Sequence, residues 1–481
     1  MLLLKRRDFL IKSTIMTAGL ATGCASTRIL GSNESVHIGI IGVGGKGSHT
    51  AKQVIGIAGA RLVALADPDP NYKMGYCKDE LGKGENPIDV KIYSDYRKLL
   101  ERKDIDAVII ASCNHWHALH AIHALQAGKH IYLEKPVSHD VWQGRQLVSL
   151  SRRSGLVVQA GLQHRSAYCW PEIREYLKEG HLGKIICARA LCYKRRKSIG
   201  VLSKPRKPPE GCDYDLWLGP AQELPLMRPN FHYDWHWVWN TGNGDLGNQA
   251  VHQVDIGRWL LGEKRYPKRV SSIGGRFGYE DAGETANTQF IYYDYEPVPL
   301  IAEIRGLPEN PGVESMSVYK KSRISNVFEC EDGFISDNVV YDVNGKMIRQ
   351  FSGHGQENHL PAFIQAIQDQ NPQSVPCSVE DGHISSALCH LGNISHRTGQ
   401  SSEPDIILQT VKSSTLQSET LQRIFEHLTK NKIDLQKNKL ILGPTLTFDS
   451  NLEKFIGAGA QPANALLKDN YREAWTVPEF T

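Results

Sequence analysis

Three glycines and an aspartate near the start of the chain have the spacing of a dinucleotide-binding turn. An apolar run of strand length leads directly into Gly42, Gly44 and Gly47, and a second apolar run ends at Asp67, 20 residues after Gly47. In such a turn Gly42 permits the sharp bend, Gly44 lets the backbone approach a pyrophosphate, and Gly47 allows close packing of helix on strand. A carboxylate at position 67 would accept hydrogen bonds from a ribose hydroxyl and repel a 2′-phosphate. The pattern therefore predicts NAD, in preference to NADP, as the cofactor.

A polar cluster follows a later apolar run, residues 107–111. It consists of Asn114, His115, Trp116 and His117. Ligands of parallel sheets bind at the carboxyl ends of the strands. Asn114 and His117 are therefore candidate contacts for the cofactor or substrate, and Trp116 is a candidate packing surface. The alternative for His117 is that it caps the following helix.

The segment 231–240 is unusually rich in aromatic residues, at positions 231, 233, 235, 237 and 239. On a strand, residues at alternate positions such as 233, 235, 237 and 239 would share one face. Aromatic faces flanked by histidine and aspartate would suit a sugar ring, which makes Trp235 and His236 candidate substrate contacts. A packed aromatic core or a dimer contact is the alternative.

Two further features point to no special chemistry. The basic run 194–197 is typical of a solvated loop, with an anion site as the alternative. The ten cysteines contain no CxxC pair, so no metal site is predicted and most of them are interpreted as small buried side chains.

Length and charge indicate an ordinary soluble protein of two domains. The 481 residues are too many for one typical core. The formal net charge of +4 is small and gives no reason to expect a nucleic-acid partner.

The first residues resemble a twin-arginine export signal. Arg6 and Arg7 precede a short apolar stretch that cannot span a bilayer, and a small residue precedes Cys24. We expect residues 1–35 to direct export to the periplasm. A lipid anchor at Cys24 is the one candidate membrane contact, and it stays open because Ala21 stands where lipoprotein signals usually have leucine.

Strand-like and helix-like segments alternate after the leader. The expected strands are 36–41, 61–66, 90–93, 107–111, 130–133 and 156–160, and helices are expected over 117–127 and 141–154. This alternation predicts a doubly wound α/β sheet. Strand-like runs return in the second half of the chain, at 185–193, 270–277 and 288–293.

Several motifs together resemble the Gfo/Idh/MocA superfamily, named after glucose–fructose oxidoreductase, inositol dehydrogenase and rhizopine catabolism. They are the glycine turn, Asn114 to His117, Glu134-Lys135-Pro136, Gln163-His164-Arg165 and the stretch 242–259. The resemblance implies a Rossmann domain over residues 36–162. It also implies a substrate domain over 163–481 with a large open, mostly antiparallel sheet, whose final segment 469–481 returns toward the first domain. Homodimers or homotetramers are common in this family.

The same resemblance implies roles for individual residues. Lys135 would lie between cofactor and substrate, behind a peptide bond to Pro136 that is often cis in the family. His252 matches the general base of the dehydrogenases. Asn248 replaces an aspartate four residues before that base, so a carboxylate–histidine pair is in doubt, and Asp255 is expected to support structure.

The family also suggests where three other polar residues lie. Glu134 is expected to face the cofactor. Gln163 and Arg165 are expected to line the substrate pocket, with a role in linking the domains as the alternative.

Three functions are consistent with these residues. The first is an NAD(P)-dependent oxidoreductase acting on a CH–OH group of a sugar, polyol or glycoside, with a cofactor retained through export. The second is a redox-neutral, NAD-dependent glycosidase of the same fold. The third, a non-enzymatic sugar-binding protein, is disfavoured because Lys135 and His252 are both present.

Overall fold

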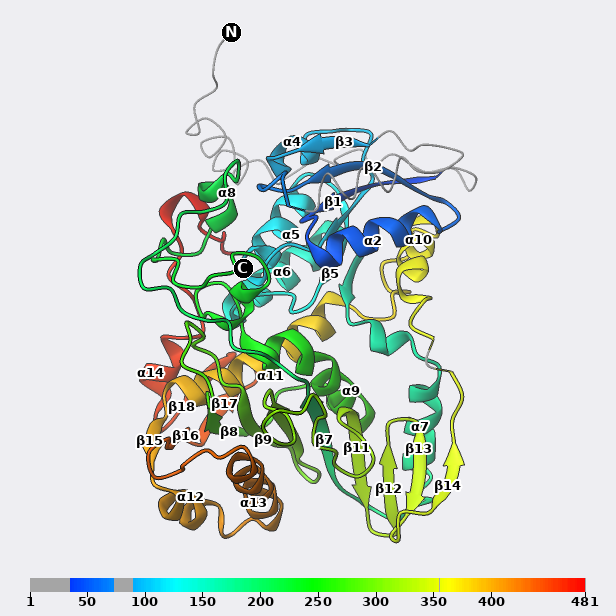
Figure 1. Cartoon of the computed structure of the whole chain (residues 1–481). Coiled ribbons are helices and arrows are strands. Elements are labelled where there is room, and N and C mark those ends of the chain that lie inside the picture. Colours follow the sequence, from blue (N-terminus) through cyan, green and yellow to red (C-terminus); the bar gives the residue numbers. More distant parts are fainter. Residues whose placement is uncertain (1–34, 73–89, 354, 481) are drawn as a thin grey trace.

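The chain folds into two α/β domains that lie one above the other in Figure 1. The computed structural model describes residues 35–72, 90–353 and 355–480. The expected export signal and Cys24 lie outside these residues. Within them, no helix has the length and apolar character needed to cross a membrane.

The first domain contains a six-stranded parallel sheet with the order β3-β2-β1-β4-β5-β6. This order confirms the predicted doubly wound fold. Its strands are β1 (Val36–Ile41), β2 (Ala60–Ala66), β3 (Lys91–Tyr93), β4 (Ala107–Ile110), β5 (His130–Glu134) and β6 (Val158–Gly161).

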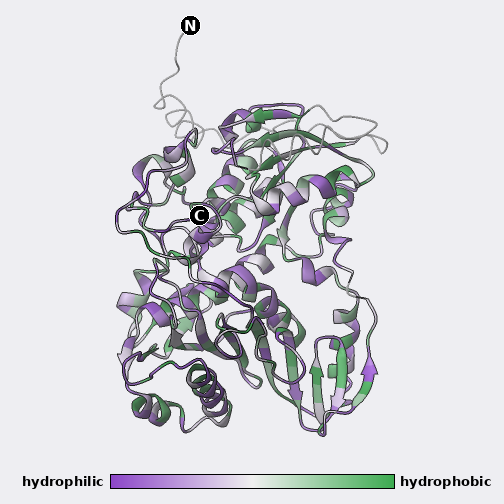
Figure 2. Ribbon diagram, in the orientation of Figure 1, coloured by the Kyte–Doolittle hydropathy of each residue, from purple (hydrophilic) through white to green (hydrophobic). Residues whose placement is uncertain are grey.

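Helices cover both faces of this sheet, which explains why its strands are almost continuously apolar. In β4 all four residues are buried, and Figure 2 shows hydrophobic colour along the strands. The helices are α2 (Gly45–Ile55), α4 (Tyr96–Leu100), α5 (His117–Gln126) and α6 (Val141–Ser154). Helix α10 (His359–Gln368) comes from much later in the chain, yet its apolar side packs on β1 and lies beside α2 in Figure 1.

The second domain is built on a twelve-stranded sheet. Strands β7 and β10 pair in parallel, whereas the other pairs among its described strands are antiparallel, as predicted. The strands are β7 (Ile185–Tyr193), β8 (Arg269–Gly275), β9 (Thr288–Asp294), β10 (Leu300–Arg305), β11 (Ile324–Cys330), β12 (Gly333–Ser336), β13 (Val339–Asp342), β14 (Met347–Gln350), β15 (Gln400–Ser402), β16 (Leu440–Leu442), β17 (Leu446–Asp449) and β18 (Lys454–Ile456).

Two helices of the second domain lie between its sheet and the first domain. They are α9 (Val251–Leu261), which contacts β7, and α11 (Val379–Arg397), which contacts β8. Most of the polar run 414–437 forms α13 (Thr415–Lys430), which packs on β9. The other helices are α7 (Cys169–Lys178), α8 (Tyr214–Leu218), α12 (Pro404–Val411), α13 (Thr415–Lys430) and α14 (Ala460–Asn464), with 3-10 turns η2 (Asn114–Trp116), η3 (Gln163–Ser166), η4 (Asp234–Trp237) and η6 (Glu473–Trp475) and a π-helical turn η5 (Leu246–Ala250).

Residues 469–480 lie against the first domain. The Tyr471 hydroxyl donates a hydrogen bond of 2.6 Å to Asp140, the residue that caps α6. The Trp475 ring meets the Trp116 ring edge to face, with 5.0 Å between centroids. This segment therefore supports a residue on the edge of the sheet where ligands are expected.

Candidate active site

A cavity of about 520 Å³ lies where the carboxyl ends of the first sheet's strands face the second domain. Most of the predicted site residues line it, but Gly47 and Arg165 do not. The predicted residues that line it are Gly42, Gly44, Asp67, Asn114, His117, Glu134, Lys135, Gln163, Trp235, His236, Asn248 and His252.

The glycine turn forms one end of the cavity. Gly42 has a φ of 86°, and a Cβ there would lie 2.5 Å from the backbone nitrogen of Ser112. A Cβ on Gly44 would instead have Tyr72 at 3.8 Å as its nearest neighbour, so this side of the turn is open. Helix α2 begins at Gly45 with no acidic residue in its first turn. The open backbone and the positive helix end fit a pyrophosphate.

Asp67 lies beside this turn, at the end of β2. Its two carboxylate oxygens accept hydrogen bonds from the backbone amides of Val43 (2.7 Å) and Asp69 (2.9 Å). Burial raises the pKa of the carboxyl to about 6, although the two amides oppose the shift. Each oxygen retains a lone pair for a hydroxyl of a bound ribose.

Glu134 lies farther along the cavity, at the end of β5. Its carboxylate pairs with the ammonium of Lys46, from the glycine turn, at 3.2 Å. It also accepts a hydrogen bond of 2.9 Å from Gln163 Nε2, which donates to the Tyr132 hydroxyl as well. Glu134 and Gln163 thus hold one another at the floor of the cavity.

Lys135 follows Glu134 directly and projects toward the second domain. Its peptide bond to Pro136 is cis. The Nζ donates to the backbone carbonyl of Asn248 at 2.6 Å and lies 3.4 Å from the Asn248 side-chain oxygen. Burial lowers the pKa of this ammonium, while Glu134 opposes that change.

His252 reaches the same cavity from the second residue of α9. The helix is preceded by the π-helical turn η5, which contains Asn248, and such turns are frequent at functional sites. The His252 ring stacks on His164 with 4.7 Å between centroids. Burial holds the pKa of His252 well below its usual value, and the charge of Lys135 adds to this effect. The ring is therefore neutral near pH 7 and able to accept a proton.

No carboxylate among the described residues hydrogen-bonds to the His252 ring, and its Nδ1 is buried without a partner there. Asn248 is directed to Lys135 instead. The doubt about a carboxylate–histidine pair, raised by asparagine at this position, agrees with this geometry.

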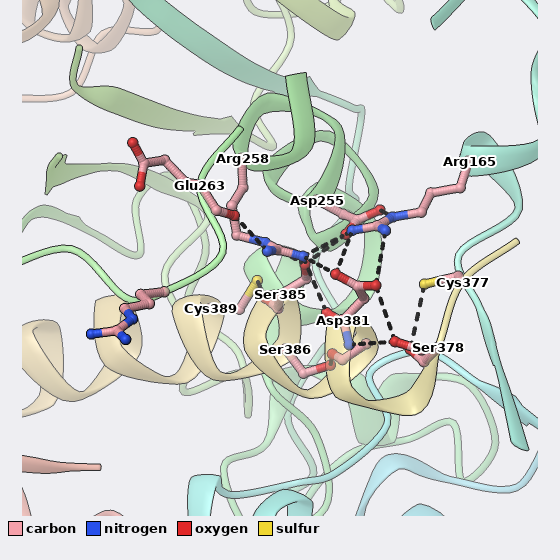
Figure 3. Close-up of polar contacts among 12 residues, drawn as sticks. Arg165, Asp255, Arg258, Glu263, Cys377, Ser378, Asp381, Ser385, Ser386 and Cys389 are labelled. Atoms are coloured by element: carbon pink, nitrogen blue, oxygen red, sulfur yellow. Dashed lines mark hydrogen bonds and ion pairs between the residues drawn. The ribbon is translucent and has the colours of Figure 1, made fainter. Parts of the chain in front are cut away.

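The expectation that Arg165 lines the pocket is wrong. Its guanidinium forms two hydrogen bonds of 2.8 Å to Asp255 on α9, as Figure 3 shows. It also pairs with Asp381 on α11, which Arg258 contacts as well. The group is buried beneath the site and joins η3, α9 and α11. Because Asp255 lies one helical turn after His252, this network fixes the helix that presents the imidazole.

The aromatic segment does not form a strand, so its aromatic residues lack the shared face that a strand would give them. Residues 234–237 form the 3-10 turn η4, which follows Tyr233 at a φ of 65°. Trp235 and His236 both line the cavity, with their rings stacked 3.6 Å apart. Trp237 is buried, with the Arg196 guanidinium 4.9 Å from its ring, so the aromatic residues do not share one face.

His117 and Asn114 are tied to the protein itself. The two ring nitrogens of His117 lie 2.6 Å from the Pro136 carbonyl and 2.9 Å from the Ser112 carbonyl, so neither is available to a ligand. His117 thus links the cis-proline turn to Ser112, and because its ring also lines the cavity, its contact with a ligand stays a prediction. Asn114 donates to the Asn243 side chain at 3.0 Å.

Sequence reasoning missed several residues of the cavity wall. Lys194 follows β7 directly and lines the cavity, and the neighbouring Arg196 is paired with Asp245, so the basic run is not simply a solvated loop. The signal was its position immediately after a buried strand. Tyr72 and His232 stack 3.6 Å apart near Asp67, and no local pattern linked them.

Family models place this arrangement among known proteins. Residues 36–162 match the NAD-binding Rossmann fold of an oxidoreductase family, GFO_IDH_MocA. Residues 193–431 match the C-terminal alpha/beta domain of the same family. The two matches cover more than half of the chain, which therefore belongs to the Gfo/Idh/MocA oxidoreductase family. Its first domain is an NAD-binding domain.

Individual relatives are more distant. The chain is 29% identical over 304 residues to an inositol 2-dehydrogenase of Salmonella typhimurium, covering 60% of this chain and 77% of that protein. It is 30% identical over 158 residues to a glycosyl hydrolase family 109 protein of Solibacter usitatus, covering 30% of this chain and only 36% of that protein.

A solved structure shares the fold. It is the myo-inositol dehydrogenase from Lactobacillus casei, in complex with NAD(H) and myo-inositol. The TM-score is 0.51 at 17% identity, and the match covers 76% of this chain and 95% of that one.

Proposed function

We propose that the protein is an NAD-dependent oxidoreductase acting on a CH–OH group of a sugar, polyol or glycoside. The observation that carries this proposal is that Lys135 and His252, from different domains, line one cavity with the glycine turn. The dehydrogenase relatives and the family support it.

Each side chain has a defined task in this reaction. The neutral His252 accepts the hydroxyl proton, and because its Nδ1 is enclosed, Nε2 is the nitrogen that takes it. The Lys135 ammonium donates a hydrogen bond to the substrate oxygen and stabilises the charge that develops there. Asn248 holds Lys135 in position. NAD, when bound at the glycine turn, supplies the acceptor for the hydride.

The leader adds a proposal about location. Export by the twin-arginine signal around Arg6 and Arg7 would carry the folded protein to the periplasm. Free NAD is scarce there, so the cofactor is retained and regenerated within each cycle. A lipid anchor at Cys24 and assembly as a homodimer or homotetramer belong to the same proposal.

A redox-neutral glycosidase is the second candidate. It is favoured by the relative named as a glycosyl hydrolase family 109 protein. Such a reaction combines transient oxidation of the sugar with elimination, addition of water and reduction, and it needs an additional base. Tyr233 and His236 are candidates for this base because they line the cavity, whereas the neighbouring Asp234 does not.

Product analysis distinguishes the two functions. The mature protein is purified, its bound nicotinamide is measured after denaturation, and sugars and aryl glycosides are then supplied. A ketosugar formed together with stoichiometric NADH supports the oxidoreductase. Release of the aglycone without net redox change, followed by NMR, supports the glycosidase. Absence of both products and of bound nicotinamide would refute both.

The choice of cofactor gives a separate prediction. Asp67→Asn removes the charge that repels a 2′-phosphate, and we expect NADP to bind the cofactor-free protein about tenfold more tightly as a result. In the wild type, discrimination against NADP should weaken as the pH falls through about 6, because the pKa of Asp67 is raised and the carboxyl becomes protonated. Titrations with NAD and NADP at pH 8 and pH 5 measure both effects.

The Asp67→Asn protein is also the control for the pH series, because it retains the titration of the phosphate itself. If the ratio of NAD affinity to NADP affinity changed equally with pH in the wild type and in Asp67→Asn, Asp67 would not discriminate between a hydroxyl and a phosphate at the 2′ position.

A further inference from the structure

Lys194 is a second lysine at the substrate end of the cavity. It follows the last residue of β7, which directs it from the sheet into the cavity wall. Its Nζ donates a hydrogen bond of 2.8 Å to Gln249 Oε1. Lys135 donates to the adjacent residue, Asn248. Both ammonium groups are thus held by the same π-helical turn.

The charges around the cavity do not balance at this end. Among the described residues that line it, Lys46, Lys135 and Lys194 are the lysines, and Asp67 and Glu134 are the carboxylates. Lys46 pairs with Glu134, and Asp67 lies at the ribose end, where backbone amides hold it.

Among the described residues, no carboxylate forms an ion pair within 4.0 Å with Lys135 or Lys194. The nearby Asp245 is paired with Arg196 instead, whose Nε and Nη2 each donate a hydrogen bond to one of its oxygens. Burial lowers the pKa of both ammonium groups. Two neighbouring cations that line one cavity without a direct ion pair are unfavourable, and a bound anion would offset that cost.

We propose that Lys194 binds an anionic substituent of the substrate, so that this enzyme acts on sugars or polyols that carry a carboxylate or a phosphate group. The inference rests on the proposed function and names its substrate class. Lys135 remains with the reacting hydroxyl, while Lys194, steadied by Gln249, holds the charged group. The distance between the two groups would then fix which hydroxyl faces His252.

Binding of matched sugars tests this directly and without turnover. Isothermal titration calorimetry of the protein, as purified with its nicotinamide, compares glucose with glucuronate and glucose 6-phosphate, and galactose with galacturonate. We expect an acidic member of at least one set to bind about tenfold or more tightly than its neutral counterpart, as for hydrogen bonds to charged groups. Comparison of glucuronate with glucose 6-phosphate shows whether the protein prefers a carboxylate or a phosphate group.

Variants of Lys194 test whether this residue causes the tighter binding of acidic sugars. Lys194→Gln should abolish the preference for the acid, and Lys194→Arg should restore part of it. The matched control is Lys197→Gln, three residues along, because the Lys197 side chain is 77% exposed. That variant should bind as the wild type does.

Two results would overturn the inference. One is equal binding of neutral and acidic sugars in every set, and the other is an acid preference that survives in Lys194→Gln. Formation of NADH from neutral sugars alone, unchanged in Lys194→Gln, would refute the acidic substrate but leave the oxidoreductase standing. If an acidic sugar binds through Lys194 but is never oxidised, the anion-binding role of Lys194 stands and the oxidoreductase is refuted.

Discussion

Replacing Lys135 with methionine is expected to lower turnover by two to four orders of magnitude, the usual range for a group that acts in proton transfer. Methionine fills a similar volume but cannot donate the hydrogen bond that stabilises the substrate oxygen. The cofactor cradle lies at the other end of the cavity, so bound nicotinamide should remain. Reduction of that nicotinamide after mixing with substrate, followed by absorbance, measures the rate.

Two further variants sharpen this test. Lys98→Met removes a 60% exposed lysine of the same domain and should leave the rate unchanged. His252→Ala should lose a factor similar to that of Lys135→Met. Because both groups act on one hydroxyl, the double variant should be little worse than the poorer single variant. Full activity in Lys135→Met, with the cofactor bound and the melting temperature preserved, would show that the lysine takes no part in the reaction.

Gly47→Ala is expected to destabilise the first domain and abolish retention of nicotinamide. A Cβ at this position would lie 1.8 Å from the carbonyl oxygen of Gly42, a backbone atom that cannot move without opening the turn. Helix propensity alone would favour alanine by about 1 kcal/mol. The collision outweighs this gain, since overpacking costs about 1–3 kcal/mol even where flexible side chains can yield. Thermal unfolding and the nicotinamide content of the purified protein measure both effects.

Gly45→Ala is the matched control in the same helix. A Cβ there meets nothing within 4 Å. This variant should therefore melt at or slightly above the wild-type temperature. If both alanines were tolerated equally, the tight packing at position 47 would not be required for the cradle.

The features that could be predicted from sequence are those encoded locally. The glycine turn, the buried strand before it and Asp67 lie within about thirty residues, and the physical demands of the turn dictate their types. The order of the six strands follows from the same alternation of strand and helix. Lys135 and His252 were placed together through the motifs of the family.

The errors concern partners that are distant in the sequence. The family resemblance implied a pocket contact for Arg165, but Asp255 and Asp381, 90 and 216 residues later, neutralise it below the site. Segment 231–240 has the alternation of a strand, yet Tyr233 adopts a positive φ and the backbone turns. Lys194 belongs to a basic run whose other members are paired or exposed. The local sequence does not show which of several neighbouring basic side chains lines a cavity.

The contact between Trp475 and Trp116 has a consequence for biosynthesis. Domains generally begin to fold as soon as they leave the ribosome, at about 5–20 residues per second. The nucleotide-binding domain emerges first, but the segment that supports Trp116 follows on the order of tens of seconds later. We therefore expect the nucleotide pocket to mature only after residues 469–480 have been translated, and a nascent chain stalled before them should capture nicotinamide poorly.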